Sequence, residues 1–175
     1  LTKAATFYQK ACDTGHAKSC SLLGIMYEDA DGVDKDLAKA ATLYQISCEG
    51  GFFKGCFFMG IAYDNGDGVE KDPTKAAAFY QKACDEDVVE ACTNLGMMYD
   101  NGNGVEKDET KAASLYQKAC DGQNAKSCFN LAVSYRNGQG VTKDVAKATA
   151  LYQQACDLGD TDACNALKST ETAKP

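Results

Sequence analysis

One spacing constrains this sequence more than any other feature, because its cysteines recur every 36 residues in two parallel series. The first series is Cys12, Cys48, Cys84, Cys120 and Cys156, and the second is Cys20, Cys56, Cys92, Cys128 and Cys164. The nine tyrosines follow the same spacing, as Tyr8, Tyr44, Tyr80, Tyr116 and Tyr152 and as Tyr27, Tyr63, Tyr99 and Tyr135. Self-similarity at such a period is typical of repeat proteins, in which each copy packs on its neighbours.

One repeat is read most clearly from residues 53–88. Apolar residues three and four apart near 53–64 predict an amphipathic helix, called helix A. Gly66 then suits a left-handed helix exit, and Asp72, followed directly by proline, suits the N-cap of a second helix, helix B, near 73–84. A lone hairpin cannot bury its apolar faces, whereas stacked hairpins can. We therefore expect an all-α, α/α superhelical solenoid of about four and a half 36-residue helix-turn-helix repeats.

The other copies repeat the same order of helix A, turn, N-cap and helix B, and this order gives the predicted domain organisation. A single solenoid is expected over 1–168, with a leading B helix, hairpins near 17–52, 53–88, 89–124 and 125–160, a trailing A helix near 161–169, and a polar tail over 169–175. Further N-caps are predicted at Asp36, Asp108 and Asp144. Ala30 departs from the pattern, since its counterparts are glycines. We expect either backbone strain or an altered turn there, at a cost of up to about 1 kcal/mol if the turn needs positive φ.

A longer motif carries a family resemblance. Residues 95–119, LGMMYDNGNGVEKDETKAASLYQKA, match L-G-x-x-Y-x-x-G-x-G-V-x-x-D-x-x-K-A-x-x-x-Y-x-x-A almost throughout. This pattern resembles the Sel1-like repeat, a relative of the tetratricopeptide repeat. The added cysteines make the chain similar to the cysteine-rich secreted Sel1-repeat proteins of Helicobacter and related bacteria. The resemblance is specific for fold and much less so for function, because such repeats serve many partners.

The cysteines are predicted to form one disulfide per repeat junction, between the end of a helix B and the start of the next helix A. A short turn between antiparallel helices places residues eight apart opposite one another, within disulfide reach. The expected pairs are Cys12–Cys20, Cys48–Cys56, Cys84–Cys92, Cys120–Cys128 and Cys156–Cys164. Each closes a short loop, worth roughly 2–3 kcal/mol in the chain-entropy treatment. An even, regular cysteine framework indicates an oxidising compartment, so a secreted or periplasmic protein whose signal peptide lay upstream of this chain is expected.

Composition excludes several classes of ligand. The formal net charge of −7 argues against nucleic acid, which needs a cationic surface, and no apolar run approaches the length of a membrane-spanning helix. The chain has one histidine, His16, and no C-x-x-C pair, so neither a metal site nor a redox pair is expected. The DNGDGVEKD loop lacks the ligand spacing of a calcium-binding loop. We expect no cofactor and no metal.

The function expected from regular copies is a protein- or peptide-binding scaffold. An alternative comes from the resemblance, because some cysteine-rich relatives have been described as penicillin-binding or β-lactamase-like. The S-x-x-K, S-D-N and K-T-G motifs of class A β-lactamases are missing from this sequence, so the alternative has no nucleophile that we can name. No catalytic residue is therefore predicted.

The resemblance implies that helices A line the concave surface and that a partner binds there. The positions that this carries over are Phe57, Ile61, Asp64, Asn65, Met97, Asp100, Asn101, Phe129, Val133, Arg136 and Asn137, to which the first helix A adds Lys18, Ser21, Ile25 and Glu28. Three features of this set are an apolar stripe, a row of asparagines able to bond a peptide backbone, and one arginine that interrupts an acidic row. Competing interpretations stay open: the stripe as core, the asparagines as helix caps, and Arg136 as a solvated side chain.

The two ends of the array complete the sequence-based expectations. The chain opens on a helix B whose N-cap is missing from the sequence pattern, and it stops after a helix A. Uncapped solenoid ends expose apolar surface, so we expect either further repeats upstream or end-to-end packing on another molecule. The sequence does not set the oligomeric state.

Overall fold

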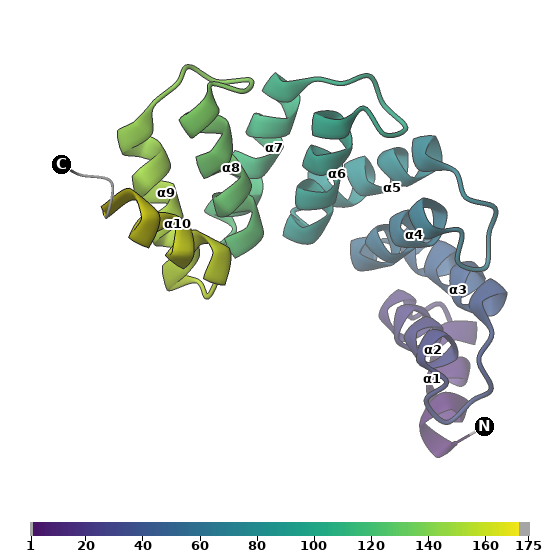
Figure 1. The fold of residues 1–175 in the computed structure, drawn as a ribbon. Helices are drawn as coiled ribbons and strands as arrows, with labels where there is room; N and C mark the ends of the chain where they lie inside the picture. Colours follow the sequence, from purple (N-terminus) through teal and green to yellow (C-terminus); the bar gives the residue numbers. More distant parts are fainter. Residues whose placement is uncertain (1, 172–175) are drawn as a thin grey trace. The chain divides into compact units, whose positions relative to one another are not determined.

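A computed structural model describes residues 2–171 of the chain, with side chains described up to residue 168. Over this range the protein consists of helices joined by turns and loops, with no strand (Figure 1). The B helices are α1 (Lys3–Asp13), α3 (Leu37–Glu49), α5 (Pro73–Asp85), α7 (Glu109–Asp121) and α9 (Val145–Asp157). The A helices are α2 (Ala17–Asp29), α4 (Phe53–Asn65), α6 (Val89–Asn101), α8 (Ala125–Asn137) and α10 (Thr161–Glu171). The predicted all-α repeat architecture is confirmed.

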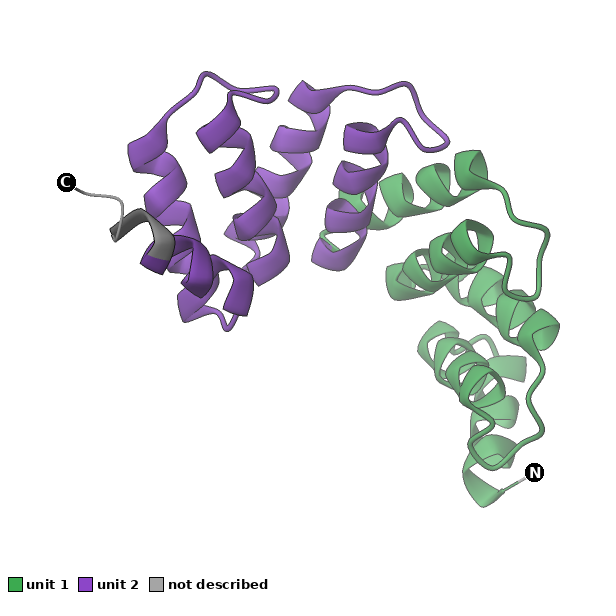
Figure 2. Ribbon diagram, viewed as in Figure 1, with its two compact units in different colours: residues 1–88 green, residues 89–175 purple. Residues whose placement is uncertain are grey.

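The helices form two compact units, residues 1–88 and 89–175 (Figure 2). In unit 1 each of α1 to α5 packs against its neighbours in the chain, and in unit 2 the same holds for α6 to α10. Each unit has its own core, built largely from alanines, cysteines, leucines and the tyrosines of the B helices. Small residues on the B helices let the helix axes come close, while the tyrosines fill the space between them.

Aspartate caps start the B helices as the sequence predicts. The side chains of Asp36, Asp72, Asp108 and Asp144 accept hydrogen bonds from the backbone N–H three residues later, over 2.9–3.0 Å. The bond from the Lys75 backbone N–H is the main reason why the pKa of Asp72 lies below its ordinary value. One prediction is corrected here. Helix α1 does have an N-cap, Thr2, whose hydroxyl accepts from the backbone N–H of Ala5, because threonine can cap as aspartate does.

Ala30 takes up the left-handed backbone that its position requires. Its φ and ψ are 59° and 32°, and its counterparts Gly66 and Gly138 have φ of 87° and 79°. The turn therefore does need the positive φ on which the expected strain depended. A second set was not predicted: Asp87 and Gln123 also have positive φ, of 61° and 64°. Both occupy the turn position at which Gly15, Gly51 and Gly159 stand in the other repeats.

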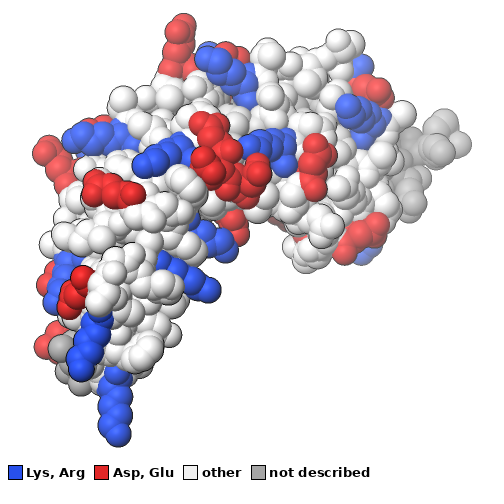
Figure 3. Space-filling view, turned by 180° about the vertical axis from the view of Figure 1, so that it is seen from behind, with Lys and Arg blue, Asp and Glu red and all other residues white. Residues whose placement is uncertain are grey.

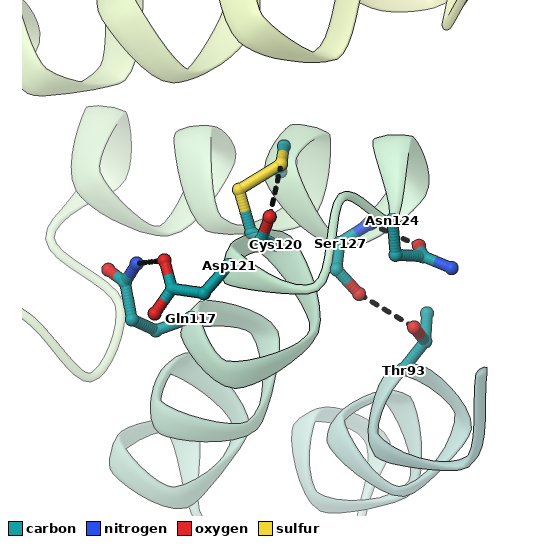
Figure 4. The surroundings of a disulfide bond; sticks show 7 residues. Thr93, Gln117, Cys120, Asp121, Asn124 and Ser127 are labelled. Carbon is teal, nitrogen blue, oxygen red and sulfur yellow. Dashed lines mark hydrogen bonds between the residues drawn. A yellow bond between two sulfur atoms is a disulfide. The ribbon is translucent and has the colours of Figure 1, made fainter. Parts of the chain in front are cut away.

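Disulfides close the three-residue turns from helix B to helix A. Cys12–Cys20, Cys48–Cys56, Cys120–Cys128 and Cys156–Cys164 join Cα atoms 4.6–4.8 Å apart. Cys84 and Cys92 are disulfide-bonded as well, which accounts for all ten cysteines. Figure 4 shows the bond at Cys120 beside two further links, Asn124 capping α8 and Thr93 bonding Ser127 across helices α6 and α8. The predicted disulfide framework is confirmed.

The buried tyrosines of the B helices lie directly on glycines of the preceding A helices. A Cβ atom added at Gly24, Gly60 or Gly96 would come within 2.6 Å of the ring of Tyr44, Tyr80 or Tyr116, respectively. These tyrosines are no more than 2% exposed. The fourth repeat has Ala132 where the others have glycine, and Ala132 and Tyr152 are both buried in the core of unit 2.

The trailing helix runs further than predicted. Helix α10 continues to Glu171, two residues past the expected end at 169, so it includes the start of the expected polar tail. Residues 172–175 of that tail lie outside the described residues.

Candidate partner-binding site

The acidic residues near the ends of the A helices are bonded within the protein. The hydroxyl of Tyr44 donates to a carboxylate oxygen of Glu28, and that of Tyr116 donates to Asp100 over 2.9 Å. In both pairs the tyrosine lies on the following B helix, 16 residues after the acid. Asp64, at the matching position of the second repeat, is half-buried. Glu28 and Asp100 thus each fix a buried tyrosine, in addition to any contact with a partner.

The same pairs keep the tyrosine hydroxyls protonated. Burial is the largest cause that raises the pKa of Tyr44 above its ordinary value, and the hydrogen bond and charge of Glu28 raise it further. Burial also raises the pKa of Tyr116, with the charge and hydrogen bond of Asp100 adding to it. At neutral pH both hydroxyls are hydrogen-bond donors, and neither can serve as a base.

Arg136 takes the place of the acid in the fourth repeat. Its guanidinium carbon lies 5.6 Å from the centre of the Tyr152 ring, within cation–π range. An arginine side chain has donors only, so it cannot accept the proton of the tyrosine hydroxyl. The buried hydroxyl of Tyr152 has no hydrogen-bond partner among the residues that the structure describes. This repeat therefore differs chemically from the first and third.

The predicted apolar stripe is half-buried along its whole length. Ile25 packs against the core of unit 1, and Met97 and Val133 pack against the core of unit 2. Ile61 lines a cavity in unit 1 together with Ile25. The stripe is thus partly core and partly surface.

The two phenylalanines of the predicted set pack against tyrosines of the next helix. They are Phe57 and Phe129. The ring centre of Phe57 lies 6.0 Å from that of Tyr80, and the ring centre of Phe129 lies 5.5 Å from that of Tyr152. Both phenylalanines are half-buried. They supply packing within the repeat as well as apolar surface.

The three asparagines at the ends of the A helices are exposed and hydrogen-bonded locally. Asn65 donates to Asp67 over 3.0 Å, and Asn137 donates to Gln139 over 3.1 Å. Asn101 donates instead to the backbone carbonyl of Met97 over 2.8 Å. A peptide backbone would have to replace these bonds in order to use the asparagines.

The lysines that follow the aspartate caps lie over tyrosines of the A helices. Lys39 and Lys147 lie 4.3 and 4.2 Å from the ring centres of Tyr27 and Tyr135, and each also donates to the hydroxyl of that tyrosine. Across the face drawn in Figure 3, acidic and basic side chains are interspersed rather than separated. These lysines are therefore used to cover aromatic surface.

A cavity of about 210 Å³ opens between α2, α3 and α4 in unit 1. Its apolar lining consists of Ile25, Leu37, Ala40, Ala41, Phe58, Ile61 and Ala62. The carboxylates of Glu28, Asp29 and Asp67 also line it. At this size the cavity suits one large side chain better than a drug-sized ligand, for which about 300 Å³ or more is usual.

Two polar contacts of this surface lay beyond the sequence-based prediction. One is the buried hydrogen bond of 2.7 Å between the hydroxyls of Thr93 and Ser127, which joins successive A helices. The other is the tyrosine-to-acid bond. Its signal was present in the sequence, since an acid stands 16 residues before Tyr44, Tyr80 and Tyr116 alike.

Stacked two-helix repeats with a recurrent L-G-x-x-Y pattern and apolar A-helix surfaces define a class of interaction scaffolds. The Sel1 repeat model matches residues 1–16, 17–52, 54–88, 89–124 and 125–160. The chain belongs to the Sel1 repeat family, whose members generally mediate protein–protein interactions.

Solved structures agree with this assignment. A protective antigen present in uropathogenic Escherichia coli strains is 33% identical with a TM-score of 0.90, and the match covers 93% of this chain and 35% of that one. A Sel1 repeat protein from Oxalobacter formigenes is 28% identical with a TM-score of 0.84, covering 89% and 64%. Helicobacter pylori cysteine-rich protein B is 34% identical with a TM-score of 0.62, covering 76% and 96%. The chain thus spans about a third of the first of these proteins and less than two thirds of the second.

A search of curated proteins found no match. None of the solved structures named above supports the enzymatic alternative. Among the described residues, no helix has both the length and the apolar character that crossing a membrane requires.

Proposed function

We propose that this protein is an interaction scaffold of an exported bacterial protein, and that it binds an extended segment of a partner protein on its A-helix surfaces. The observation that carries the proposal is the cavity of unit 1, which combines apolar side chains with three carboxylates. Apolar pockets with a few polar groups at their rim are the usual form of a binding site.

The charges around this cavity favour a particular partner residue. Glu28 is already bonded to Tyr44, whereas Asp29 is exposed at the end of α2. A segment with an apolar side chain next to a lysine or arginine would contact the apolar lining and place its cation beside Asp29 and Asp67. The chain's net charge of −7 would attract such a segment at longer range.

Export is supported by the oxidised cysteines. All ten are disulfide-bonded, and disulfides persist in oxidising compartments such as the periplasm or the exterior of the cell. One of the similar structures, Helicobacter pylori cysteine-rich protein B, is named for its cysteine content. Alkylation followed by mass spectrometry on fractionated source cells tests this part, because free thiols in a cytoplasmic pool would contradict it.

Peptide display tests the binding proposal. Random twelve-residue peptides would be selected on the immobilised, oxidised protein, and we expect enrichment of an apolar residue beside a basic one. The selected peptides should bind an Asp29→Lys variant and an Ile61→Ser variant at least tenfold more weakly than the parent protein.

The matched control is Glu70→Lys, which makes the same charge change at an exposed acid of unit 1 that does not line the cavity. Binding should survive this change. Equal binding by the Asp29→Lys, Ile61→Ser and Glu70→Lys variants would show that the cavity is not the site. Failure to enrich any peptide would refute the peptide-binding proposal as a whole.

A further inference from the structure

The hydroxyl of Tyr152 is unsatisfied because its repeat has lost the groups that satisfy Tyr116. Asp100 accepts the hydrogen bond that the Tyr116 hydroxyl donates, and Asn130 on the next A helix lowers the pKa of this tyrosine through its side-chain amide. The residues at the same offsets from Tyr152 are Arg136 and Ala166. Neither side chain contains an acceptor oxygen.

Tyr152 is nonetheless as deeply buried as Tyr44, Tyr80 and Tyr116 at the same position of the earlier B helices. It is 2% exposed, and its hydroxyl has no hydrogen-bond partner among the described residues. Leaving a buried hydroxyl unpaired is unfavourable, so native structures rarely contain one without a reason. Burial raises the pKa of this tyrosine and the charge of Arg136 lowers it, and the net direction is upward, which keeps the proton in place.

The groups around this hydroxyl have complementary chemistry. Arg136 is exposed, lies over the tyrosine ring, and makes no ion pair within the described part of the chain. The Phe129 ring packs on Tyr152 as well, and Val133 is half-buried one helical turn before Arg136. One small area of unit 2 therefore offers an unused donor, an unpaired cation and apolar surface.

We propose that Arg136 and Tyr152 form a binding site for a carboxylate group of a partner polypeptide. The carboxylate takes the part that Asp100 plays beside Tyr116, accepting the hydrogen bond of the Tyr152 hydroxyl. The guanidinium of Arg136 moves from the ring face to pair with the same carboxylate, a pairing for which its planar fork is suited. Phe129 and Val133 hold an apolar side chain of the partner next to it.

This site is independent of the proposed cavity site in unit 1. That cavity is lined by carboxylates and favours a cationic segment, whereas the Arg136 site favours an anionic one. The carboxylate can come from the C-terminus of a polypeptide or from a glutamate or aspartate side chain. Failure of one site therefore leaves the other untouched.

A nuclear magnetic resonance titration tests the proposal directly, because Arg136 is the only arginine of the chain and its side-chain Nε–H gives a single signal. Three probes are added in turn: acetyl-Ala-Phe-Leu with a free C-terminus, the same peptide as its C-terminal amide, and acetyl-Ala-Glu-Leu-amide. We expect saturable shifts of the Arg136 signal with at least one of the two peptides that carry a carboxylate, the first and the third. We expect none with the second peptide, acetyl-Ala-Phe-Leu-amide, which carries no carboxylate. Saturation by the first peptide alone identifies a terminal carboxylate, and saturation by the third identifies a side-chain carboxylate. The proposal would be overturned if neither the first nor the third peptide gave a saturable shift, or if acetyl-Ala-Phe-Leu-amide gave shifts as large as theirs.

Two variants separate binding from folding. Tyr152→Phe removes only the hydroxyl, so we expect binding about tenfold weaker with unchanged or higher thermal stability. Tyr116→Phe is the matched control, because the same change there breaks a bond to Asp100 and should lower stability while leaving binding intact. A Tyr152→Phe variant that binds as well as the parent, or that loses as much stability as Tyr116→Phe, contradicts the proposed role of the hydroxyl.

Arg136→Asp restores the acid that the first and third repeats carry at this position. We expect it to bond the Tyr152 hydroxyl, raise the melting temperature, and abolish the binding of carboxylate peptides, followed through the backbone amide signals of residues 129–136. Retained carboxylate binding in this variant would overturn the site.

Discussion

Replacement of Ala30 by glycine should make the protein more stable, although alanine is ordinarily the better residue in folded structure. Ala30 has φ of 59° and ψ of 32°, and its side chain is exposed, so the methyl group contributes little burial. A left-handed backbone costs a non-glycine residue roughly 1–2 kcal/mol. Glycine avoids this cost but is more flexible in the unfolded chain, which offsets about 0.4–1 kcal/mol. The net gain expected for Ala30→Gly is therefore about 0.5–1 kcal/mol.

Thermal unfolding of the oxidised protein, followed by circular dichroism and calorimetry, measures this change. For a chain of this size the gain corresponds to an increase of about 1–4 °C in Tm. The reverse substitution, Gly51→Ala, is the matched control in the same unit. Its φ is 85° and an added Cβ would meet no atom within 4 Å, so only backbone strain is introduced and stability should fall. An Ala30→Gly variant that is no more stable than the parent, next to a destabilised Gly51→Ala, would refute the assignment of strain to Ala30.

Three further predictions follow from the packing. Gly96→Ala should cost about 1–3 kcal/mol, because the new Cβ would lie 2.6 Å from the Tyr116 ring. Urea unfolding measures this loss, and an unchanged free energy of unfolding would contradict the close contact. The raised pKa values of Tyr44 and Tyr116 mean that the unfolded chain loses these protons first, so their contribution to stability is complete below about pH 10 and declines above it. In a variant that carries both Tyr44→Phe and Tyr116→Phe, the alkaline unfolding transition, followed at the tyrosinate absorbance, should be less steep with pH than in the parent protein. Identical transitions in the two proteins would contradict the link between these tyrosine protons and stability. Replacing Cys48 and Cys56 together by serine should lower stability by about 2–3 kcal/mol, whereas an unchanged Tm would show that this turn is already held by its helices.

The features predictable from sequence are those that one repeat expresses within a few residues. Aspartate before a helix, glycine after it, and cysteines eight apart each specify local geometry, and the N-caps and disulfides were found where these patterns place them. The strained Ala30 could be recognised because three other repeats carry glycine at its position. The same comparison was available for Gln123, but only three of five copies are glycine there, and the weaker pattern was missed.

The candidate site was harder to predict because its chemistry depends on contacts between helices. Whether Glu28 faces a partner or a tyrosine is decided by the register of α2 against α3, which the spacing alone does not give. The same applies to Phe129, which lies on Tyr152 rather than facing solvent alone. The family resemblance implied which positions share a surface, and that placement stays a prediction. The side-chain contacts add that two of these positions, Glu28 and Asp100, already accept hydrogen bonds from tyrosines of the protein.

The placement of the disulfides divides the chain into covalent pieces that are offset from its repeats. Each of the four described bonds crosses a three-residue turn and joins a helix B to the helix A that follows it, whereas the seven-residue segments from helix A to helix B, such as 66–72, have no crosslink. A protease that cuts inside a turn would leave the two fragments joined by the disulfide across that turn. A protease that cuts a seven-residue segment would leave them held together by noncovalent packing alone. In a protease-rich environment a turn can thus be cut while its disulfide still links the two fragments covalently. Resistance to digestion therefore depends chiefly on how well the long segments are protected.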